Sequence, residues 1–367
     1  MARIHGSTNH QRREPMGIKG KTSFVTVCAI ILLMLSGCGI YSNGLPSSKE
    51  QAMTDQAKPK HLGEQNDNKK KSEKNAVERQ LYLVDAHGHV TPQVFHLPQS
   101  NEVAKQALTY LIQGGPVSNM LPDGFQAVIP ADTTFSLNLD KDGTLYADFS
   151  KEFTDYKAAN EQQIMQSITW TLTQFDNIKR VKLSVDGKPL HVMPVAQTPV
   201  PTQGLTRADG INIVKNYAGE VTSSSSMVVY YTAQSSAGNT YYVPITERYD
   251  NSKDMYTALV DALKQAPVGD NAIQAPFNSD VALTEKPSIN DKGVVTLDFN
   301  DYLYADSSKK AISDQALNCL VLTFANGLAV DRVSIEVGGK TQVVTESGKS
   351  LAQPVGVPNV NVTKTGI

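Results

Sequence analysis

Alternating apolar and polar positions mark the start of two similar halves of the chain. The segment 80–97 alternates on both sides of a His-Gly-His turn at 87–89, and the segment 226–245 alternates around an Ala-Gly-Asn turn at 237–239. A period of two residues is typical of a half-buried strand, and a short glycine-containing turn joins two such strands into a hairpin. Each half is therefore predicted to begin with a β-hairpin.

A helical period follows each hairpin. Apolar residues recur on one face over 103–112 in the first half and over 255–263 in the second, and again over 164–175 and 312–324. Spacings of three and four residues place these side chains on one side of an α-helix. Two amphipathic helices are therefore expected in each half.

A further hairpin separates the two helices of each half. In the first half, 133–139 and 144–149 flank the Asp-Lys-Asp-Gly turn at 140–143, where glycine supplies the positive φ that the turn requires. One more strand, 180–185 or 332–337, closes each half. This order predicts the α+β class, with two helices packed on one face of a mixed or antiparallel sheet.

The two halves are copies of one unit, because matching blocks recur in the same order with an offset of 150 to 152 residues. The pairs are ALTYLIQGGPV (107–117) with ALVDALKQAPV (258–268), DKDGTLYADFSKEF (140–153) with NDKGVVTLDFNDYL (290–303), and IKRVKLSVDGK (178–188) with VDRVSIEVGGK (330–340). Self-similarity at one offset indicates a repeated architecture. We predict two homologous domains, 78–190 and 226–342.

The segments beside the two copies differ from them in composition. The stretch 191–225 carries prolines and ends in serines, which predicts a linker, although its piece 210–221 is apolar enough to pack on a domain edge and fix the two domains relative to each other. The stretch 343–367 carries Pro354 and Pro358 and is predicted to be a loose or surface-draped tail.

The segment 1–37 has the parts of an export signal. A basic run precedes an apolar run that is too short to span a bilayer comfortably, and small residues follow. The exit, Leu35-Ser36-Gly37-Cys38, resembles the bacterial lipobox, whose cysteine is diacylated, for example with palmitate, and becomes the first mature residue. We therefore expect a lipoprotein signal peptide, recognised at the three residues before Cys38, with an uncleaved anchor as the alternative.

The segment 38–77 is predicted to be a disordered tether. It contains almost no large apolar residues and many charges, so it cannot bury enough surface to offset the entropy of ordering. A flexible chain of this length lets the folded part act at a distance from its lipid.

Charge and cysteine content exclude two classes of protein. The chain has 34 Lys and Arg against 36 Asp and Glu, so its net charge does not attract it to nucleic acid. A nucleic-acid partner is therefore not expected. Only Cys28, Cys38 and Cys319 occur, and the first two lie near the N-terminus. An internal disulfide framework is therefore excluded, and stability must come from packed cores.

Two polar motifs that could hold a metal ion are interpreted as turns. His87 and His89 have a suitable spacing, but we find no Cys or acidic side chain nearby at ligand spacing, and the second copy has no histidine at this turn. The motif at 140–143 has its glycine too early for a calcium loop. No metal and no cofactor is predicted.

Three further residues could carry catalysis but have a simpler interpretation. Cys319 lacks a histidine base in its copy and is expected to be a buried core thiol. Asp148 and Asp298 could form an acid–base pair, yet they occupy corresponding places in separate domains, which favours a structural use such as binding the backbone N–H groups of the following turn. No catalytic residue is predicted, and the protein is not expected to be an enzyme.

Taken together, the lipobox, the charged tether and two copies ending in VKLSVDGK and VSIEVGGK resemble the GerM family of sporulation and germination lipoproteins of endospore-forming bacteria, which carry tandem GerMN domains. The resemblance covers nearly the whole chain after the signal peptide. It implies a non-enzymatic module similar to the ring-building motifs of envelope secretion machines. Cys38 is the one residue to which the family assigns a function.

The resemblance also implies a location and partners. The protein would be lipid-anchored to the outer face of the cell membrane, on the mother-cell side facing the forespore, and would scaffold assembly of the mother cell–forespore channel complex. Its partners would be envelope and channel proteins of sporulation, and the membrane through the diacylglyceryl anchor. The alternative is a peptidoglycan-binding or weakly hydrolytic cell-wall protein acting in cortex formation, in which the tyrosine-rich runs VVYYT and TYYVP touch glycan.

Overall fold

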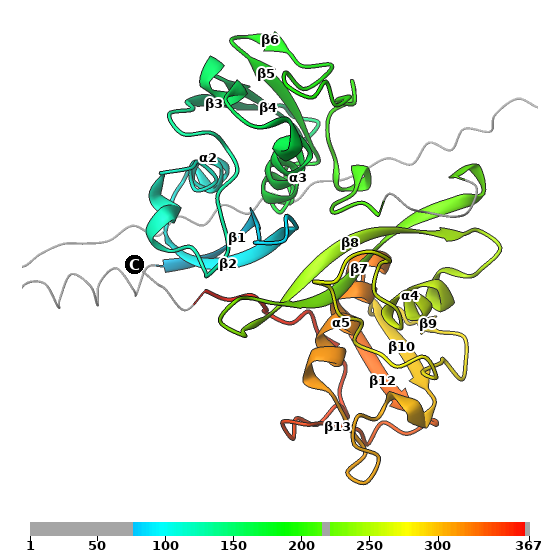
Figure 1. The fold of residues 1–367 in the computed structure, drawn as a ribbon. Coiled ribbons are helices and arrows are strands. Elements are labelled where there is room, and N and C mark those ends of the chain that lie inside the picture. Colours follow the sequence, from blue (N-terminus) through cyan, green and yellow to red (C-terminus); the bar gives the residue numbers. More distant parts are fainter. Residues whose placement is uncertain (1–75, 215–220, 364–367) are drawn as a thin grey trace, which may run out of the picture. The chain divides into compact units, whose positions relative to one another are not determined.

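The computed structural model describes residues 76–214 and 221–363, all within one compact unit, His61–Ile367 (Figure 1). Leu35, Ser36, Gly37 and Cys38 lie outside the described residues, as does nearly all of the expected tether. The signal peptide, the lipidation site and the tether therefore stay predictions from the sequence.

The first copy has the element order that its sequence predicts. Its strands are β1 (Ala76–Val84), β2 (Val90–Pro98), β3 (Phe135–Leu139), β4 (Thr144–Phe149), β5 (Arg180–Val185) and β6 (Lys188–Pro189), and its α-helices are α2 (Val103–Thr109) and α3 (Glu161–Leu172). Short 3₁₀ turns lie at Pro116–Asn119, Lys151–Thr154 and Ala158–Asn160.

The second copy repeats this order with a longer hairpin and a longer second helix. Its strands are β7 (Ser224–Gln234), β8 (Thr240–Asp250), β9 (Ser288–Ile289), β10 (Val294–Phe299), β11 (Ala311–Ile312), β12 (Arg332–Val337), β13 (Val344–Thr345) and β14 (Val355–Gly356), and its α-helices are α4 (Met255–Leu263) and α5 (Asp314–Leu328). Further 3₁₀ turns lie at Arg207–Asp209, Val221–Ser223 and Asp301–Leu303.

The α+β class is confirmed, but the strands divide between two sheets in the first copy and three in the second, where β11 and β13 form a separate pair. An antiparallel hairpin, β1–β2 or β7–β8, stands apart from a four-stranded sheet with the order β3-β4-β5-β6 or β14-β12-β10-β9. The four-stranded sheets are mixed, because β4 and β5 run parallel, as do β10 and β12, while the outer pairs are antiparallel.

The long helix of each copy explains this division. In the first copy α3 contacts both the hairpin and β5, and in the second α5 contacts both β7 and β12 (Figure 1). Side chains nearly all round α3 are buried, including Ile164, Ile168 and Trp170. A helix that is buried on opposite sides needs a layer on each side, and the hairpin and the sheet supply them.

Several predicted helix boundaries were wrong, among them the end of α3, which stops at Leu172 and leaves out Phe175. The first helix was expected to reach residue 112, yet α2 ends at Thr109, because Leu111 O accepts hydrogen bonds from Val128 N and Ile129 N and the chain turns toward that loop. The last helix was expected to begin at Ile312, yet Ile312 pairs with Thr345 as part of β11. The helix α5 instead begins after Ser313, whose hydroxyl accepts a hydrogen bond from Ala316 N.

The C-terminal segment was expected to be loose or draped over the surface, and it is draped and held in place. Its strand β14 pairs with β12, and the side chains of Val343 and Leu351 are buried. Further along, Val362 forms a parallel bridge with Val94 of the first copy. The segment therefore completes the second sheet and then reaches the first hairpin, so its packing depends on both copies.

The buried apolar residues of the two copies form one continuous core. Within residues 76–214 and 221–363, none of the helices has the length and apolar character needed to cross a membrane.

Candidate functional site: a cleft between the two copies

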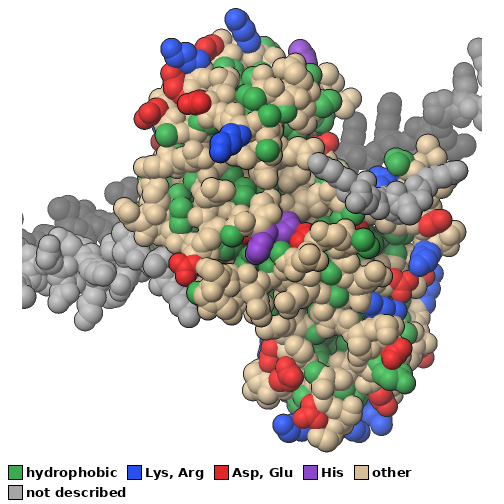
Figure 2. Space-filling view, viewed as in Figure 1, with side chains coloured by type: hydrophobic (Ala, Val, Ile, Leu, Met, Phe, Trp, Pro, Cys, Tyr) green, Lys and Arg blue, Asp and Glu red, His purple; other side chains and the backbone are tan. Residues whose placement is uncertain are grey.

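A cleft lies where the two copies meet, and histidine side chains gather beside it on the face shown in Figure 2. Its volume is about 480 Å³. It is lined by the β1–β2 turn, the N-terminal half of α3 with the 3₁₀ turn before it, Ile245 of β8, the linker at 212–214, and the loop at 267–270 that follows α4. Most of the side chains in this lining are polar.

Asp85 shapes the turn between β1 and β2. Its Oδ1 accepts hydrogen bonds from the backbone N–H groups of His87 and His89, each at 2.8 Å, and its own N–H donates to His89 O at 2.9 Å. Gly88 adopts a φ of +88°, which an L side chain would strain. The local sequence thus folds the turn in a way that presents the imidazole of His89 to the second copy.

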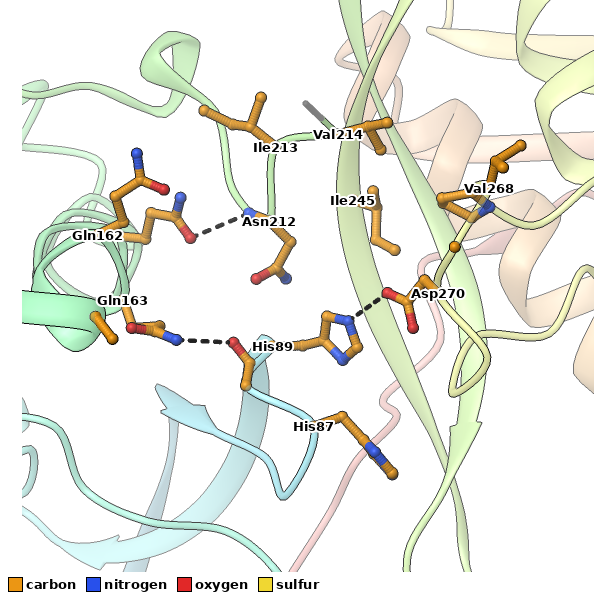
Figure 3. Close-up of a pocket in the computed structure, with 15 residues that line it drawn as sticks. His87, His89, Gln162, Gln163, Asn212, Ile213, Val214, Ile245, Val268 and Asp270 are labelled. Carbon is orange, nitrogen blue, oxygen red and sulfur yellow. Dashed lines mark hydrogen bonds and ion pairs between the residues drawn. The ribbon is translucent and has the colours of Figure 1, made fainter. Parts of the chain in front are cut away.

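The imidazole of His89 bridges two carboxylates from the two copies. Its Nδ1 lies 3.2 Å from Asp85 Oδ2, and its Nε2 lies 2.6 Å from Asp270 Oδ2, toward which Figure 3 shows the ring pointing. Both contacts are hydrogen bonds only when both ring nitrogens carry protons. The arrangement therefore favours an imidazolium held between two carboxylates, and such charge-assisted hydrogen bonds are stronger than neutral ones.

The pKa values of this group agree with its geometry. Burial by itself disfavours the imidazolium, but the hydrogen bonds and charges of Asp85 and Asp270 outweigh it and raise the pKa of His89 above its usual value. Burial likewise opposes ionisation of Asp85, yet the hydrogen bonds and charge of His89 lower the pKa of Asp85. Tyr241 of β8 contributes as well, because its hydroxyl donates to Asp85 Oδ2 at 2.9 Å.

The linker residue Asn212 connects the two hairpins. Its side-chain Oδ1 accepts from Val90 N, and its Nδ2 donates to both Val90 O and Pro244 O, each at 2.8 Å. Its backbone N–H donates to Gln166 Oε1 of α3 at 3.0 Å. One amide thus satisfies the backbone of β2 and of β8 together, at the edge where the linker was expected to pack.

The contacts of His89 join the two sides of the cleft. Each ring nitrogen of His89 contacts a carboxylate, so neither is free to act as a general base. The described residues that line the cleft include no Ser, Thr or Cys that could serve as a nucleophile. In residues 76–214 and 221–363 there is also no group of three or more His, Cys, Asp or Glu that could hold a metal ion.

The interpretation of the His-Gly-His motif was only partly right. The hairpin turn at 87–89 is confirmed, but the statement that no acidic partner lies nearby was wrong. Asp85 is four residues before His89, a spacing that was visible in the sequence. Asp270 is 181 residues away, and nothing in a single sequence links it to this turn.

The structural interpretation of Asp148 and Asp298 is confirmed. Asp148 Oδ1 accepts from Gly187 N at 2.9 Å and from Ser184 Oγ at 2.6 Å, and Asp298 Oδ1 accepts from Gly339 N at 3.0 Å. Each carboxylate therefore closes the turn that follows the neighbouring parallel strand, β5 or β12, and not the turn after its own strand.

Cys319 and the Asp-Lys-Asp-Gly segment also match their predictions. The side chain of Cys319 is fully buried, and burial raises the pKa of its thiol. Gly143 takes a φ of +86° in a tight turn that is closed by its hydrogen bond to Asp140 O. A buried thiol and a hairpin turn account for both.

The sequence analysis missed Glu161, which organises the start of the linker. Only 1% of Glu161 is exposed, and its carboxylate accepts hydrogen bonds from the backbone N–H groups of Val195, Ala196 and Thr198. The Tyr156 hydroxyl donates to it as well, at 2.8 Å. Burial alone would raise the pKa of Glu161, but these donors lower it to about 2. The backbone donors come from 34 to 37 residues downstream, so no local pattern marked this residue.

Comparison with known proteins relates the chain to sporulation. It matches the protein family described as "Germane: Sporulation and spore germination" over residues 80–191 and 228–343. It is 42% identical over 359 residues to the spore germination protein GerM of Bacillus subtilis (strain 168), covering 93% of this chain and 97% of that protein. The solved structure of the tandem GerMN domains of the sporulation protein GerM from Bacillus subtilis is similar with a TM-score of 0.73 and 45% identity, covering 79% of this chain and 100% of that one. The resemblance noted from the sequence is confirmed.

Proposed function

Because the chain belongs to the Germane family of sporulation and spore germination proteins, we propose that it acts in these processes as a non-enzymatic scaffold. The observation that carries the proposal is the contact between His89 of the first copy and Asp270 of the second, at 2.6 Å. This contact links the two domains. Together with the contact of Nδ1 to Asp85, it leaves His89 no free ring nitrogen for catalysis.

A scaffold needs binding surfaces that keep a fixed spacing. Further contacts between the two domains support such a fixed spacing. Asn212 hydrogen-bonds to both hairpins, and Asn361 donates to Pro92 O and Tyr242 O, again one acceptor in each copy. The apolar core is continuous between the copies. Partners bound to the two domains would therefore be held at a constant distance and orientation.

The proposed partners are proteins of the mother cell–forespore channel complex, and the proposed anchor is a diacylglyceryl group on Cys38. The lipobox and the tether support an anchor on the outer face of the mother-cell membrane. In sporulating cells, the wild type and a Cys28→Ser control should incorporate labelled palmitate, and the Cys38→Ser variant should not. Incorporation of the label by the Cys38→Ser variant would exclude Cys38 as the lipidation site.

The scaffold is tested by cross-linking the full chain in sporulating cells and identifying the adducts. We expect channel proteins, recovered in smaller amount with the Asp270→Asn variant, which loosens the two domains, than with an Asp155→Asn control in an exposed position. Release of sugar from purified cell wall by the wild-type chain, without channel adducts in cells, would overturn the non-enzymatic scaffold in favour of a cell-wall hydrolase.

A further inference from the structure

An unpaired backbone edge lies on β3, the outer strand of the sheet with the order β3-β4-β5-β6 (Figure 1). Asp140 N donates to Thr144 O at 2.9 Å, so in this antiparallel pair the even-numbered residues of β3 are those that bond to β4. The N–H and C=O groups of Phe135, Leu137 and Leu139 therefore point away from β4, and they have no hydrogen-bond partner among the described residues. This edge is free to pair with another strand.

Other strand edges are covered by the chain itself. On β1, Tyr82 N donates to the Thr171 hydroxyl of α3 at 2.9 Å. On β5, Val181 exchanges two hydrogen bonds with Leu205 of the linker, at 2.9 and 2.8 Å. In the second copy, β14 pairs with β12. The open edge of β3 is therefore not a general feature of the strands in this fold.

The corresponding edge of the second copy is protected against pairing. At the repeat offset of 150 residues, Phe-Ser-Leu at 135–137 corresponds to Glu-Lys-Pro at 285–287, and β9 keeps only Ser288–Ile289. Charged residues and proline are typical of edge strands that avoid pairing, because a charge resists burial and proline has no N–H to donate. The strand β3 contains neither a charged residue nor a proline. Of two equivalent edges, one is blocked and one is left open.

An apolar groove lies along β3. Its volume is about 450 Å³, and it is lined by residues 101–105 at the start of α2, by β3 with Leu145, and by Phe175 and residues 177–178 after α3. The charged side chains of its described lining, Glu102 and Lys105, pair with each other at 3.2 Å. A strand paired with β3 would place every second side chain on the face of this groove. Apolar side chains at these alternate positions would be buried against the leucines of β3.

Charges at the two ends of β3 restrict the partner further. Asp132 precedes the strand, and Asp140 and Asp142 follow it with Lys141 between them, and all four residues are exposed. Basic residues at both ends of a partner segment would be attracted to these carboxylates. A second copy of this chain would instead bring the same acidic ends, and like charges on adjacent strands are destabilising.

We propose that β3 binds an extended segment of a partner protein as an added strand of its sheet, and that this segment has apolar residues at alternate positions and basic residues at its ends. The outward N–H and C=O groups of β3 supply main-chain hydrogen bonds, and the groove receives the alternate side chains. The inference rests on the proposed scaffold role, because it names a surface through which the scaffold holds a partner.

The test is fluorescence polarisation of a labelled octapeptide, Lys-Thr-Val-Thr-Val-Thr-Val-Lys, with the purified full chain in detergent. We expect saturable binding, and hydrogen exchange at Leu137 N–H and Leu139 N–H should slow when the peptide is bound. Replacing both terminal lysines of the peptide by glutamates should weaken binding at low salt by about fivefold, as expected for the loss of two exposed charge contacts.

The matched variants are Leu139→Pro and Ile289→Pro. Leu139→Pro removes one outward N–H of β3 and no hydrogen bond to β4, and proline is tolerated at such edge positions. It should weaken peptide binding by about fivefold to tenfold, the loss expected for one hydrogen bond. Ile289 is the corresponding residue of β9 and is similarly exposed, at 46% against 39% for Leu139. Ile289→Pro should bind the peptide as the wild type does.

Several outcomes would overturn the proposal. These are no binding of the lysine-ended peptide by the wild-type chain at millimolar concentration, unchanged binding by Leu139→Pro, and an equal loss in Ile289→Pro. A purified dimer that Leu139→Pro converts to monomers would also do so, since the edge would then serve a second copy. If Leu139→Pro does not fold, the glutamate-ended peptide decides on the wild-type chain, and equal binding of both peptides contradicts the proposal. Channel proteins cross-linked in cells without any peptide binding would remove this surface and leave the scaffold role standing.

Discussion

His89 Nε2 and Asp270 Oδ2 lie 2.6 Å apart although 181 residues separate them along the chain. The side chains are 12% and 29% exposed, so solvent screens this contact only in part. Since Asp85 holds the other ring nitrogen, a single imidazole fixes the first hairpin turn and joins it to the loop after α4. The stability of the paired domains should therefore depend on the protonation of His89.

The pH dependence has a definite sign. The pKa of His89 is raised above its usual 6.5, so its contribution to stability is complete below about pH 6.5 and is lost as the pH rises through the higher folded-state value. Differential scanning calorimetry of the wild type should show this loss, and His89→Gln should not. The control His96→Gln, whose imidazole is more exposed beside Glu78, should keep the wild-type profile. A wild-type profile in His89→Gln would contradict the role of His89.

Removing the acidic partner in the second copy should loosen the domains without unfolding them. Asp270→Asn keeps the shape of the side chain but removes the negative charge opposite His89, at an expected cost of about 2 kcal/mol in the free energy of unfolding at pH 6. The difference from wild type should shrink above the pKa of His89. Urea unfolding at several pH values measures both effects, and a cost that is the same at every pH would rule out the charge as its cause.

Asn212 should be one of the most sensitive residues of the linker. Asn212→Ala leaves Val90 N–H and two carbonyl groups without their partner, for an expected cost of about 2–3 kcal/mol in the free energy of unfolding. The residue also has a φ of +46°, which asparagine tolerates better than alanine. Asn212→Gly separates these effects, because glycine removes the side chain without the backbone strain.

The control for Asn212 is Asn138→Ala at an exposed position of β3, which should change stability by less than about 0.5 kcal/mol. Hydrogen exchange at Val90 N–H provides a second measurement. It should accelerate in both Asn212 variants, and protection equal to wild type would show that this hydrogen bond does not hold the hairpin.

Glu161 should govern the acid stability of the first domain and linker. Its pKa is about 2, below the usual 4.5, so its contribution is complete above about pH 4.5 and is lost as the pH falls toward 2. Glu161→Gln places an amide against backbone donors and should cost about 2–3 kcal/mol at pH 7. The difference from wild type should narrow below pH 4.5, as measured by thermal unfolding. The exposed control Glu102→Gln should remain close to wild type, and a Glu161→Gln cost that persisted at pH 2 would contradict the assignment.

Asp148 should behave as a turn-closing residue and not as a catalyst. Asp148→Ala removes the acceptor for Gly187 N and Ser184 Oγ, and should cost about 1–2 kcal/mol in the free energy of unfolding. Asp298→Ala should give a similar loss in the second copy. The exposed control Asp155→Ala should have little effect. Additive losses in the double variant are expected, because the two turns belong to separate sheets, and strong coupling would indicate a shared site.

Local patterns predicted the fold of each copy well. The strands 180–185 and 332–337 have the predicted bounds, and α4 covers the predicted range 255–263. The helix boundaries predicted from periodicity were wrong where backbone groups form hydrogen bonds to residues outside the helix. Leu111 turned away from its helix to pair with the loop at 128–129, and Ile312 left its helix to pair with Thr345.

The sequence was sufficient for properties that short segments carry within themselves. The number of copies and their α+β class follow from periodicity and internal repetition. Repetition also marked Asp148 and Asp298 as structural, although the backbone N–H groups that they bind lie 39 and 41 residues away. The cleft and the return of the C-terminal segment to the first hairpin depended on how the two copies dock. The hydrogen bonds of Glu161 depended on how the linker folds back onto the first copy. His89 with Asp270, and Val94 with Val362, are contacts between distant segments, and their geometry exists only once a continuous core has formed between the domains. Local sequence can specify a strand or a helix because its hydrogen bonds and burial pattern are close along the chain, whereas a contact between domains has no such local signal.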